Sequence, residues 1–235
     1  MEIPYEYAYL TAVAFFGFFW AVFFLIKPSV RREMLALSFL TMLFGFFQYF
    51  YTHDYWQPVT LFGIQRLDLE SFFLAFFYGG VGAALYEMLF FEKRNPPAHP
   101  GSPLLTIFAV PVALILMTVG IFILGWNSLY VSVLILFAFG AAMILYRSVL
   151  FKHALYSGLL FMGLTFACAS FMMFLFPGVI EKWWMLPNLS GALISGIPVE
   201  ELFFGFAWGF FAGPASELLA RMDFSGVLKS GKRKR

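Results

Sequence analysis

The chain has few charged residues and a single cysteine. Charged residues make up 12% of its 235 residues and hydrophobic residues 62%, whereas a soluble domain has about 25% charged and about 45–50% apolar residues. This composition excludes an ordinary soluble enzyme. The single cysteine, Cys168, excludes an internal disulfide framework and a zinc or iron–sulfur site built from several cysteines. Three histidines, His53, His99 and His153, leave few candidate metal ligands.

Several cofactor motifs are also missing. The sequence has no glycine-rich phosphate loop and no dinucleotide-binding fingerprint. Its last apolar segment, residues 199–219, holds no lysine for a retinal Schiff base. The run Glu200-Glu201-Leu-Phe-Phe-Gly is similar to the double-glutamate motif of membrane CaaX-type proteases, but the arginine of that motif is absent. A net charge of +2 is too small to indicate nucleic acid. We therefore expect no cofactor, no metal and no nucleic-acid partner.

Long apolar runs occupy most of the chain. A transmembrane helix needs roughly 20 predominantly apolar residues, and seven stretches bounded by charges or by Pro and Gly meet this requirement. The predicted spans lie near residues 7–26, 34–51, 69–91, 104–124, 129–146, 154–176 and 199–219. The sequence therefore predicts an all-α membrane protein, residues 1–235, with seven transmembrane helices in contact with membrane lipid.

Basic residues are distributed unevenly between the two sides of the predicted bundle. Counted by alternate loops, all lysines and arginines except Arg66 and Lys182 lie on one side. Cytoplasmic loops carry the positive excess, so the C-terminus is predicted to be cytoplasmic and the N-terminus outside, most simply in the plasma membrane. The basic tail, residues 220–235, is expected to meet anionic lipid headgroups.

Two segments of the chain share a pattern at an offset of 130 residues. The matching positions are Glu70 with Glu200, Phe73 with Phe203, Phe76 with Phe206, Tyr78 with Trp208, Gly79 with Gly209 and Glu87 with Glu217. As the third and seventh spans, the two segments run in the same direction. The pattern predicts two parallel three-helix repeats, about 7–91 and 129–219, joined by a linking helix at about 104–124 and related by an axis along the membrane normal.

Three glutamates near the outer helix ends are the candidate catalytic residues: Glu70, Glu200 and Glu201. Carboxyls within a membrane are usually functional, and a recurrent pair favours a shared site over simple capping of a helix N-terminus. We expect Glu70 and Glu200 to approach each other across the bundle centre. Glu201 lies about 100° of helix turn from Glu200, so one of these two can serve the site while the other caps the helix or binds a loop.

Aromatic side chains are abundant, with 34 Phe, 11 Tyr and 6 Trp. Aromatic faces attract cations without offering a nucleophile, and a neutral carboxylic acid in a dry cavity can protonate an apolar substrate. Most of these rings are expected to face lipid or to pack. The repeated positions Phe73, Phe203, Tyr78 and Trp208 are the candidate substrate-binding residues for an apolar polyene or polyprenyl chain.

These motifs resemble those of a known family. Residues 67–87 and 196–217 are similar to the paired Pro-x-Glu-Glu segments of the lycopene cyclase domain, the small membrane type of carotenoid cyclase. The run His53-Asp54-Tyr55-Trp56 resembles the loop with Asp and Trp that precedes the motif in that family. The first copy departs from the pattern, since Asp68 stands for the proline and Ser71 for the second glutamate.

The resemblance implies a redox-neutral cyclase of the intramolecular lyase or isomerase type, which converts the ends of a linear carotene into β-ionone-type rings without a soluble cofactor. An acid would protonate the terminal double bond, the neighbouring alkene would close the ring, and a base would remove a proton. The motif glutamates fall on Glu70, Glu200 and Glu201. Two alternatives stay open: a membrane terpene cyclase acting on another polyprenyl substrate, and a non-catalytic seven-helix protein that binds a carotenoid or another lipid.

Overall fold

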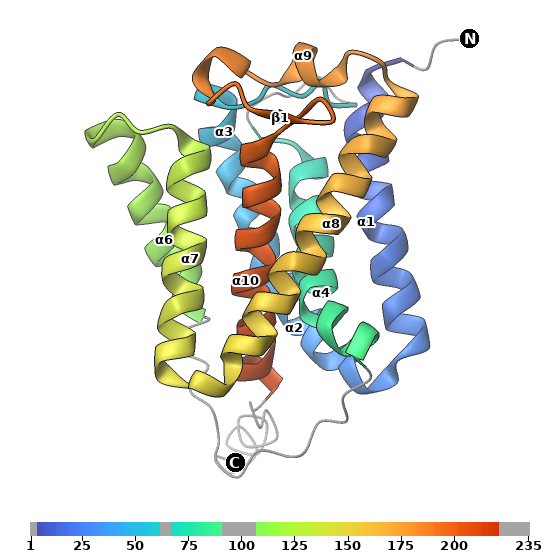
Figure 1. The fold of residues 1–235 in the computed structure, drawn as a ribbon, viewed down its shortest axis with the longest axis vertical. Coiled ribbons are helices and arrows are strands. Elements are labelled where there is room, and N and C mark those ends of the chain that lie inside the picture. The colour runs from blue at the N-terminus through green and yellow to red at the C-terminus, as the bar shows by residue number, and fades with distance from the viewer. Residues whose placement is uncertain (1–3, 62–66, 91–106, 221–235) are drawn as a thin grey trace, which may run out of the picture.

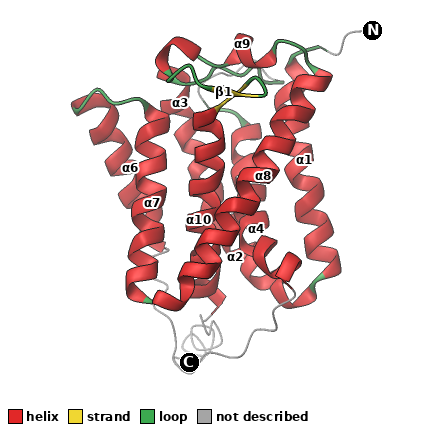
Figure 2. Cartoon of the chain, in the orientation of Figure 1, coloured by secondary structure: helices red, strands yellow, loops and turns green. Residues whose placement is uncertain are grey.

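The computed structural model describes residues 4–61, 67–90 and 107–220 (Figure 1). Within these residues the chain is almost entirely helical (Figure 2). Six helices are long and apolar enough to cross a membrane: Glu6–Ile26, Pro28–Asp54, Leu69–Phe90, Ser128–Tyr146, Ser148–Leu175 and Val199–Leu219. A shorter apolar helix, Ala109–Ile123, occupies the place of the fourth predicted span. The protein is therefore an all-α membrane protein with several long apolar helices, as the sequence predicts.

The elements of the first half follow the predicted spans closely. They are α1 (Glu6–Ile26), η1 (Pro28–Val30), α2 (Arg31–Met42), η2 (Leu43–Phe47), α3 (Gln48–Asp54) and α4 (Leu69–Phe90). The second helical stretch begins earlier than predicted, because Pro28 starts a short 3₁₀ turn that runs directly into α2. Proline fits the first turn of a helix, where its missing N–H has no intrahelical partner.

The second half contains the remaining helices and a small hairpin. Its elements are α6 (Ala109–Thr118), η3 (Val119–Ile123), α7 (Ser128–Tyr146), η4 (Ser148–Leu150), α8 (Phe151–Leu175), α9 (Val179–Trp183), η5 (Leu186–Asn188), β1 (Leu193–Ile194), β2 (Ile197–Pro198) and α10 (Val199–Ala220). Helix α10 packs against α8, α7, α4 and α2 and so lies at the centre of the bundle. The helix α9 and the hairpin cover the end of the bundle at which α1, α4 and α10 begin (Figure 1).

Large apolar side chains cover much of the outer surface of the helices. Leu145 is 88% exposed and Phe174 80% exposed, on α7 and α8. Contiguous exposed apolar surface of this kind is rare on soluble monomers. Its presence on helices of this length fits contact with lipid tails.

Two glycines let pairs of helices approach closely. A Cβ atom on Gly79 of α4 would lie 1.9 Å from Thr41 Oγ1 and 2.8 Å from the Leu37 carbonyl oxygen of α2. A Cβ atom on Gly209 of α10 would lie 2.2 Å from the Ser157 carbonyl oxygen of α8. Small residues at helix contacts are typical of membrane proteins. Because the two glycines match at the 130-residue offset, these contacts support the predicted repeat, whose superposition stays a prediction.

The loops that precede α4 and α10 pair with each other. Trp56 and Trp184 form an antiparallel β-bridge, and the Gln57 N–H donates to the Trp183 carbonyl oxygen at 2.7 Å. An antiparallel pair of corresponding segments is related by a local two-fold rotation, which is what two parallel repeats would produce at their junction. The pairing joins the two halves directly above α4 and α10.

Asp54, at the end of α3, caps the N-terminus of α7. Its carboxylate accepts hydrogen bonds from the Ser128 backbone N–H at 2.9 Å and from the Ser128 hydroxyl at 2.5 Å. Its carbonyl oxygen accepts from the side chains of Asn127 and Asn188. Asp54 is therefore a structural tie between the two halves of the chain.

Candidate active site

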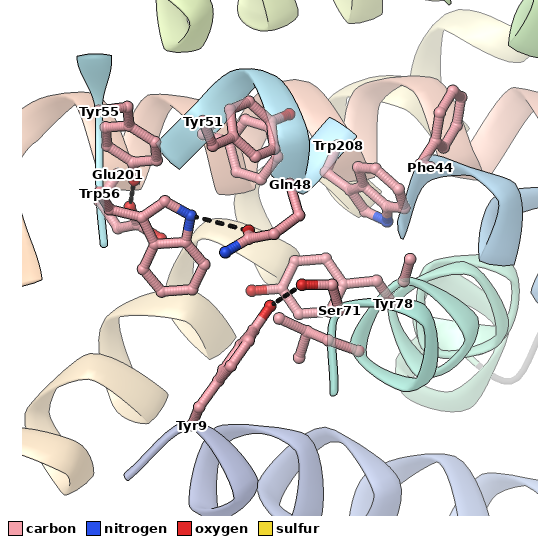
Figure 3. A pocket seen from close by; sticks show the side chains of 13 residues that line it. Tyr9, Phe44, Gln48, Tyr51, Tyr55, Trp56, Ser71, Tyr78, Glu201 and Trp208 are labelled. Carbon is pink, nitrogen blue, oxygen red and sulfur yellow. Dashed lines mark hydrogen bonds between the residues drawn. The ribbon is translucent and has the colours of Figure 1, made fainter. Parts of the chain in front are cut away.

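A pocket opens between α1, η2, α3, α4, α10 and the loop that follows α3 (Figure 3). It has an empty volume of about 600 Å³, with the space at its mouth included. The lining residues are Tyr9, Phe44, Gln48, Tyr51, Tyr55, Trp56, Ser71, Leu74, Ala75, Tyr78, Glu201, Phe204 and Trp208. Apolar and aromatic side chains with a few polar groups are the usual lining of a small-molecule site.

Glu201 is the acidic side chain among the described residues that line this pocket. It lies in the first turn of α10, where its Oε2 accepts a hydrogen bond from the Tyr55 hydroxyl. The indole N–H of Trp184 donates to the same oxygen at 3.2 Å. Both donors come from the paired outer loops. Because they engage Oε2, a proton bound to this carboxyl is carried by Oε1.

The corresponding position of the first repeat, Ser71, lines the same pocket. Its hydroxyl lies 2.7 Å from the hydroxyl of Tyr9 on α1 (Figure 3). The pocket thus receives the second residue of each repeated motif, a glutamate from α10 and a serine from α4.

The first residues of the two motifs, Glu70 and Glu200, are buried but bind the loops that precede their helices. Glu70 Oε1 accepts the Leu61 N–H at 2.8 Å. Glu200 Oε1 accepts the Ser190 N–H at 2.7 Å and the Tyr130 hydroxyl at 2.9 Å. Each of these two glutamates therefore holds a backbone N–H group of the loop before its helix. The approach of Glu70 and Glu200 across the bundle centre stays a prediction.

Two of the four predicted substrate-binding residues line the pocket. The rings of Tyr78 and Trp208 meet edge to face with centroids 5.5 Å apart. Phe73 and Phe203, in contrast, are 49% and 55% exposed and are absent from the described pocket lining. The reason is helical geometry, since each lies two residues, or about 200°, beyond the motif position that faces the pocket.

Several residues that line the pocket were not predicted from the sequence, although helical spacing indicates some of them. Counted from Glu201, Phe204 and Trp208 follow at three and seven residues, on the same helix face. Counted from Ser71, Ala75 and Tyr78 follow at four and seven residues. The lining residues from α1, α3 and the outer loop have no comparable signal, because they reach the pocket through tertiary contacts.

A second cavity adjoins the pocket on the side of α6 and α7. The two share Phe44, Tyr51, Phe204 and Trp208 as lining residues. The second cavity is lined almost entirely by apolar side chains. The apolar lining therefore continues from the pocket toward α6 and α7.

Asp68 lies immediately before α4 and acts as the helix cap predicted for it. The Ser71 backbone N–H donates to Asp68 Oδ1 at 2.6 Å, the usual contact of a capping aspartate. Asp68 is only 5% exposed. Burial raises the pKa of the Asp68 carboxyl to about 6, although hydrogen bonds from Ser71 oppose the shift.

Some sequence expectations fall outside the described residues. These are the placements of Arg66, His99 and the basic tail, residues 220–235, of which the structure describes only the backbone of Ala220. Within the described ranges, no group of three or more His, Cys, Asp and Glu side chains could hold a metal ion. The absence of a metal and a cofactor stays a prediction.

Residues 127–219 match the family model described as lycopene cyclase. The match contains α7, α8 and α10, and with them both Glu200 and Glu201. It confirms the resemblance to the lycopene cyclase domain family for the second motif segment, residues 196–217, whereas the first, residues 67–87, lies outside the match. No curated protein and no solved structure matches the chain.

Proposed function

We propose that the protein is a membrane-embedded carotenoid cyclase that closes β-ionone-type rings at the ends of a linear carotene, with Glu201 as the acid. The observation that carries this proposal is the placement of Glu201 in an apolar, aromatic pocket with one carboxyl oxygen held by Tyr55 and Trp184. The family match supports it, because the matched residues 127–219 include this glutamate and its helix.

In the proposed reaction, Glu201 transfers the proton on Oε1 to the terminal carbon–carbon double bond. The neighbouring double bond then attacks the cation and forms the ring bond, which moves the positive charge into the ring. Loss of a proton next to that carbon creates the new double bond. One proton enters and one leaves, so the carotene is isomerised without redox change.

The surrounding residues favour the charged intermediates. When Glu201 has lost its proton, the hydroxyl of Tyr55 and the indole N–H of Trp184 donate charge-assisted hydrogen bonds to the carboxylate. The rings of Tyr78 and Trp208 can stabilise the cation through their faces. The same rings exclude water, which would otherwise capture the cation as an alcohol.

Glu70 and Glu200 have a different proposed role. Each carboxylate holds the loop before its helix, and the loop before α10 includes the hairpin that leads to Glu201. We assign them to positioning the two motif helices and their loops. This arrangement fits the alternative in which Glu201 serves the site while its neighbour binds a loop.

Expression in a bacterial host that accumulates lycopene tests the activity. We expect cyclised carotenes of unchanged mass to replace lycopene when the pigments are separated by chromatography. When isolated membranes are supplied with lycopene in heavy water, the product should contain one deuterium for each ring closed, because the acid exchanges its proton with solvent. Lycopene that co-purifies unchanged would indicate the carotenoid-binding alternative. Lycopene that is neither bound nor converted would favour a cyclase for another polyprenyl substrate.

We also propose seven crossings and two parallel repeats, with the N-terminus outside the plasma membrane and the C-terminus in the cytoplasm. Alkaline phosphatase inserted in the α6–α7 loop at Gly125 is expected to be active, since this enzyme folds only outside the cytoplasm. Green fluorescent protein fused to the C-terminus should fluoresce. An active phosphatase at the C-terminus would contradict the orientation, and equal results at both sites would contradict an odd number of crossings between Gly125 and the C-terminus.

A further inference from the structure

The two motif positions that line the pocket carry different chemistry. Position 201 is a glutamate, whereas the corresponding position 71 is a serine. Three residues earlier it is the first copy that has the carboxyl, because Asp68 stands where the second copy has Pro198. Each copy therefore has a carboxyl that the other copy lacks, displaced by one helical turn.

A chain of contacts leads from the pocket to Asp68. The hydroxyls of Tyr9 and Ser71, which both line the pocket, are 2.7 Å apart. The Ser71 backbone N–H donates to Asp68 Oδ1 at 2.6 Å, and the nearby Ser71 hydroxyl lowers the pKa of the Asp68 carboxyl, opposing the effect of burial. All three side chains are at most 6% exposed.

Capping of α4 uses only one oxygen of Asp68. The other, Oδ2, is buried and has no hydrogen-bond partner among the described residues. A buried carboxylate oxygen without a donor is costly in free energy. Oε2 of Glu70 and Oε2 of Glu200 are in the same state, but of these three carboxyls Asp68 is the one bonded to a residue that lines the pocket. Uptake of a proton by this carboxyl would remove that cost.

We propose that Asp68 takes up the proton that the ring-closed cation releases, through the hydroxyls of Tyr9 and Ser71. This inference rests on the proposed cyclase function and adds a proton acceptor to it. The ring C–H bond breaks and its electron pair becomes the new double bond. The proton binds the Tyr9 oxygen, the Tyr9 proton passes to Ser71, and the Ser71 proton passes to the Asp68 carboxylate. Glu201 regains its own proton from solvent, and Asp68 loses its proton to solvent.

The substitution Asp68→Asn separates this role from capping. Asparagine caps helices as well as aspartate does and its side-chain oxygen can still accept the Ser71 N–H, but it cannot accept a proton. We expect formation of the normal ring to fall at least tenfold, as removal of an acid–base group typically costs about 10²–10⁴-fold. The cation should then lose a proton from a different carbon or capture water, giving ring isomers or a hydroxylated carotene.

The related variants Ser71→Ala and Tyr9→Phe interrupt the chain of hydroxyls and are expected to give the same altered products. Asp54→Asn is the control, because the Asp54 carboxylate also accepts a backbone N–H at a helix N-terminus, that of α7, and does not line the pocket. Its products should be those of the unmodified protein. All amounts are measured per folded protein, from size-exclusion chromatography in detergent.

The outcomes distinguish this inference from the proposed function. If the unmodified protein closes no rings, the function itself fails. If it closes rings and Asp68→Asn matches it in rate and products, Asp68 is only a cap. A loss of rate in Asp68→Asn with unchanged product ratios also overturns the inference, because a structural defect lowers all products together.

Discussion

Replacing Glu201 by glutamine is expected to abolish ring formation while the protein still folds and inserts. Glutamine has the shape of glutamate, and its side-chain oxygen can still accept hydrogen bonds from Tyr55 and Trp184. It has no acidic proton to give to a double bond. Since general acid catalysis contributes about 10²–10⁴-fold, the rate of lycopene loss in isolated membranes should fall by at least 10²-fold.

The neighbouring substitution Glu200→Gln is the informative comparison. Its side-chain oxygen can still accept the Ser190 N–H and the Tyr130 hydroxyl, so we expect less than a tenfold loss. The same reasoning applies to Glu70→Gln, whose oxygen can still accept the Leu61 N–H. Equal large losses at Glu70 and Glu200, with Glu201→Gln active, would instead support the site that the repeated glutamates predict.

The helices could be predicted from the sequence because lipid imposes a simple rule. Each span must satisfy its backbone hydrogen bonds internally and needs roughly 20 apolar residues, and the run from Leu69 to Phe90 or from Val199 to Leu219 has few interruptions. The charge pattern and the matching glycines can likewise be recognised in the sequence alone. Gly79 and Gly209 are identical in the two copies because each must admit a neighbouring helix.

The site was harder to predict, because residues shared by the two copies were taken as the candidates for catalysis. Glu70 and Glu200 are identical, but both hold loops. The pocket is lined where the copies differ, at Ser71 and Glu201. Under the proposed function the identical glutamates position loops, whereas the acid and the proton acceptor come from positions at which the two copies differ.

The partners of Glu201 could not be predicted from one sequence at all. Tyr55 is 146 residues away from it in the chain, and Trp184 belongs to the loop before its own helix. Both reach the carboxyl because the two outer loops pair through the bridge between Trp56 and Trp184. Pairing of distant loops depends on how the two halves pack, which no local pattern encodes.

Alanine at Gly209 is expected to destabilise the protein strongly. The new Cβ atom would lie 2.2 Å from the Ser157 carbonyl oxygen and 2.7 Å from the Ser157 carbonyl carbon. Both are backbone atoms of α8, so no change of rotamer relieves the clash and the two helices must move apart. Overpacking typically costs about 1–3 kcal/mol, and a rigid backbone contact in the central helix should reach or exceed the upper value.

The control for this packing prediction is the same substitution at Gly163, which lies on α8, the helix that Gly209 of α10 contacts. No described atom outside the local chain lies within 4 Å of a Cβ atom built there. Because glycine destabilises a helix by roughly 0.5–1 kcal/mol relative to alanine, Gly163→Ala should leave the melting temperature in detergent unchanged or slightly raised, whereas Gly209→Ala lowers it by several degrees. Gly79→Ala should resemble Gly209→Ala, since the Leu37 carbonyl oxygen would lie 2.8 Å from its Cβ atom. Equal melting temperatures for the Gly163 and Gly209 variants would mean that α8 and α10 are not held together by this close contact.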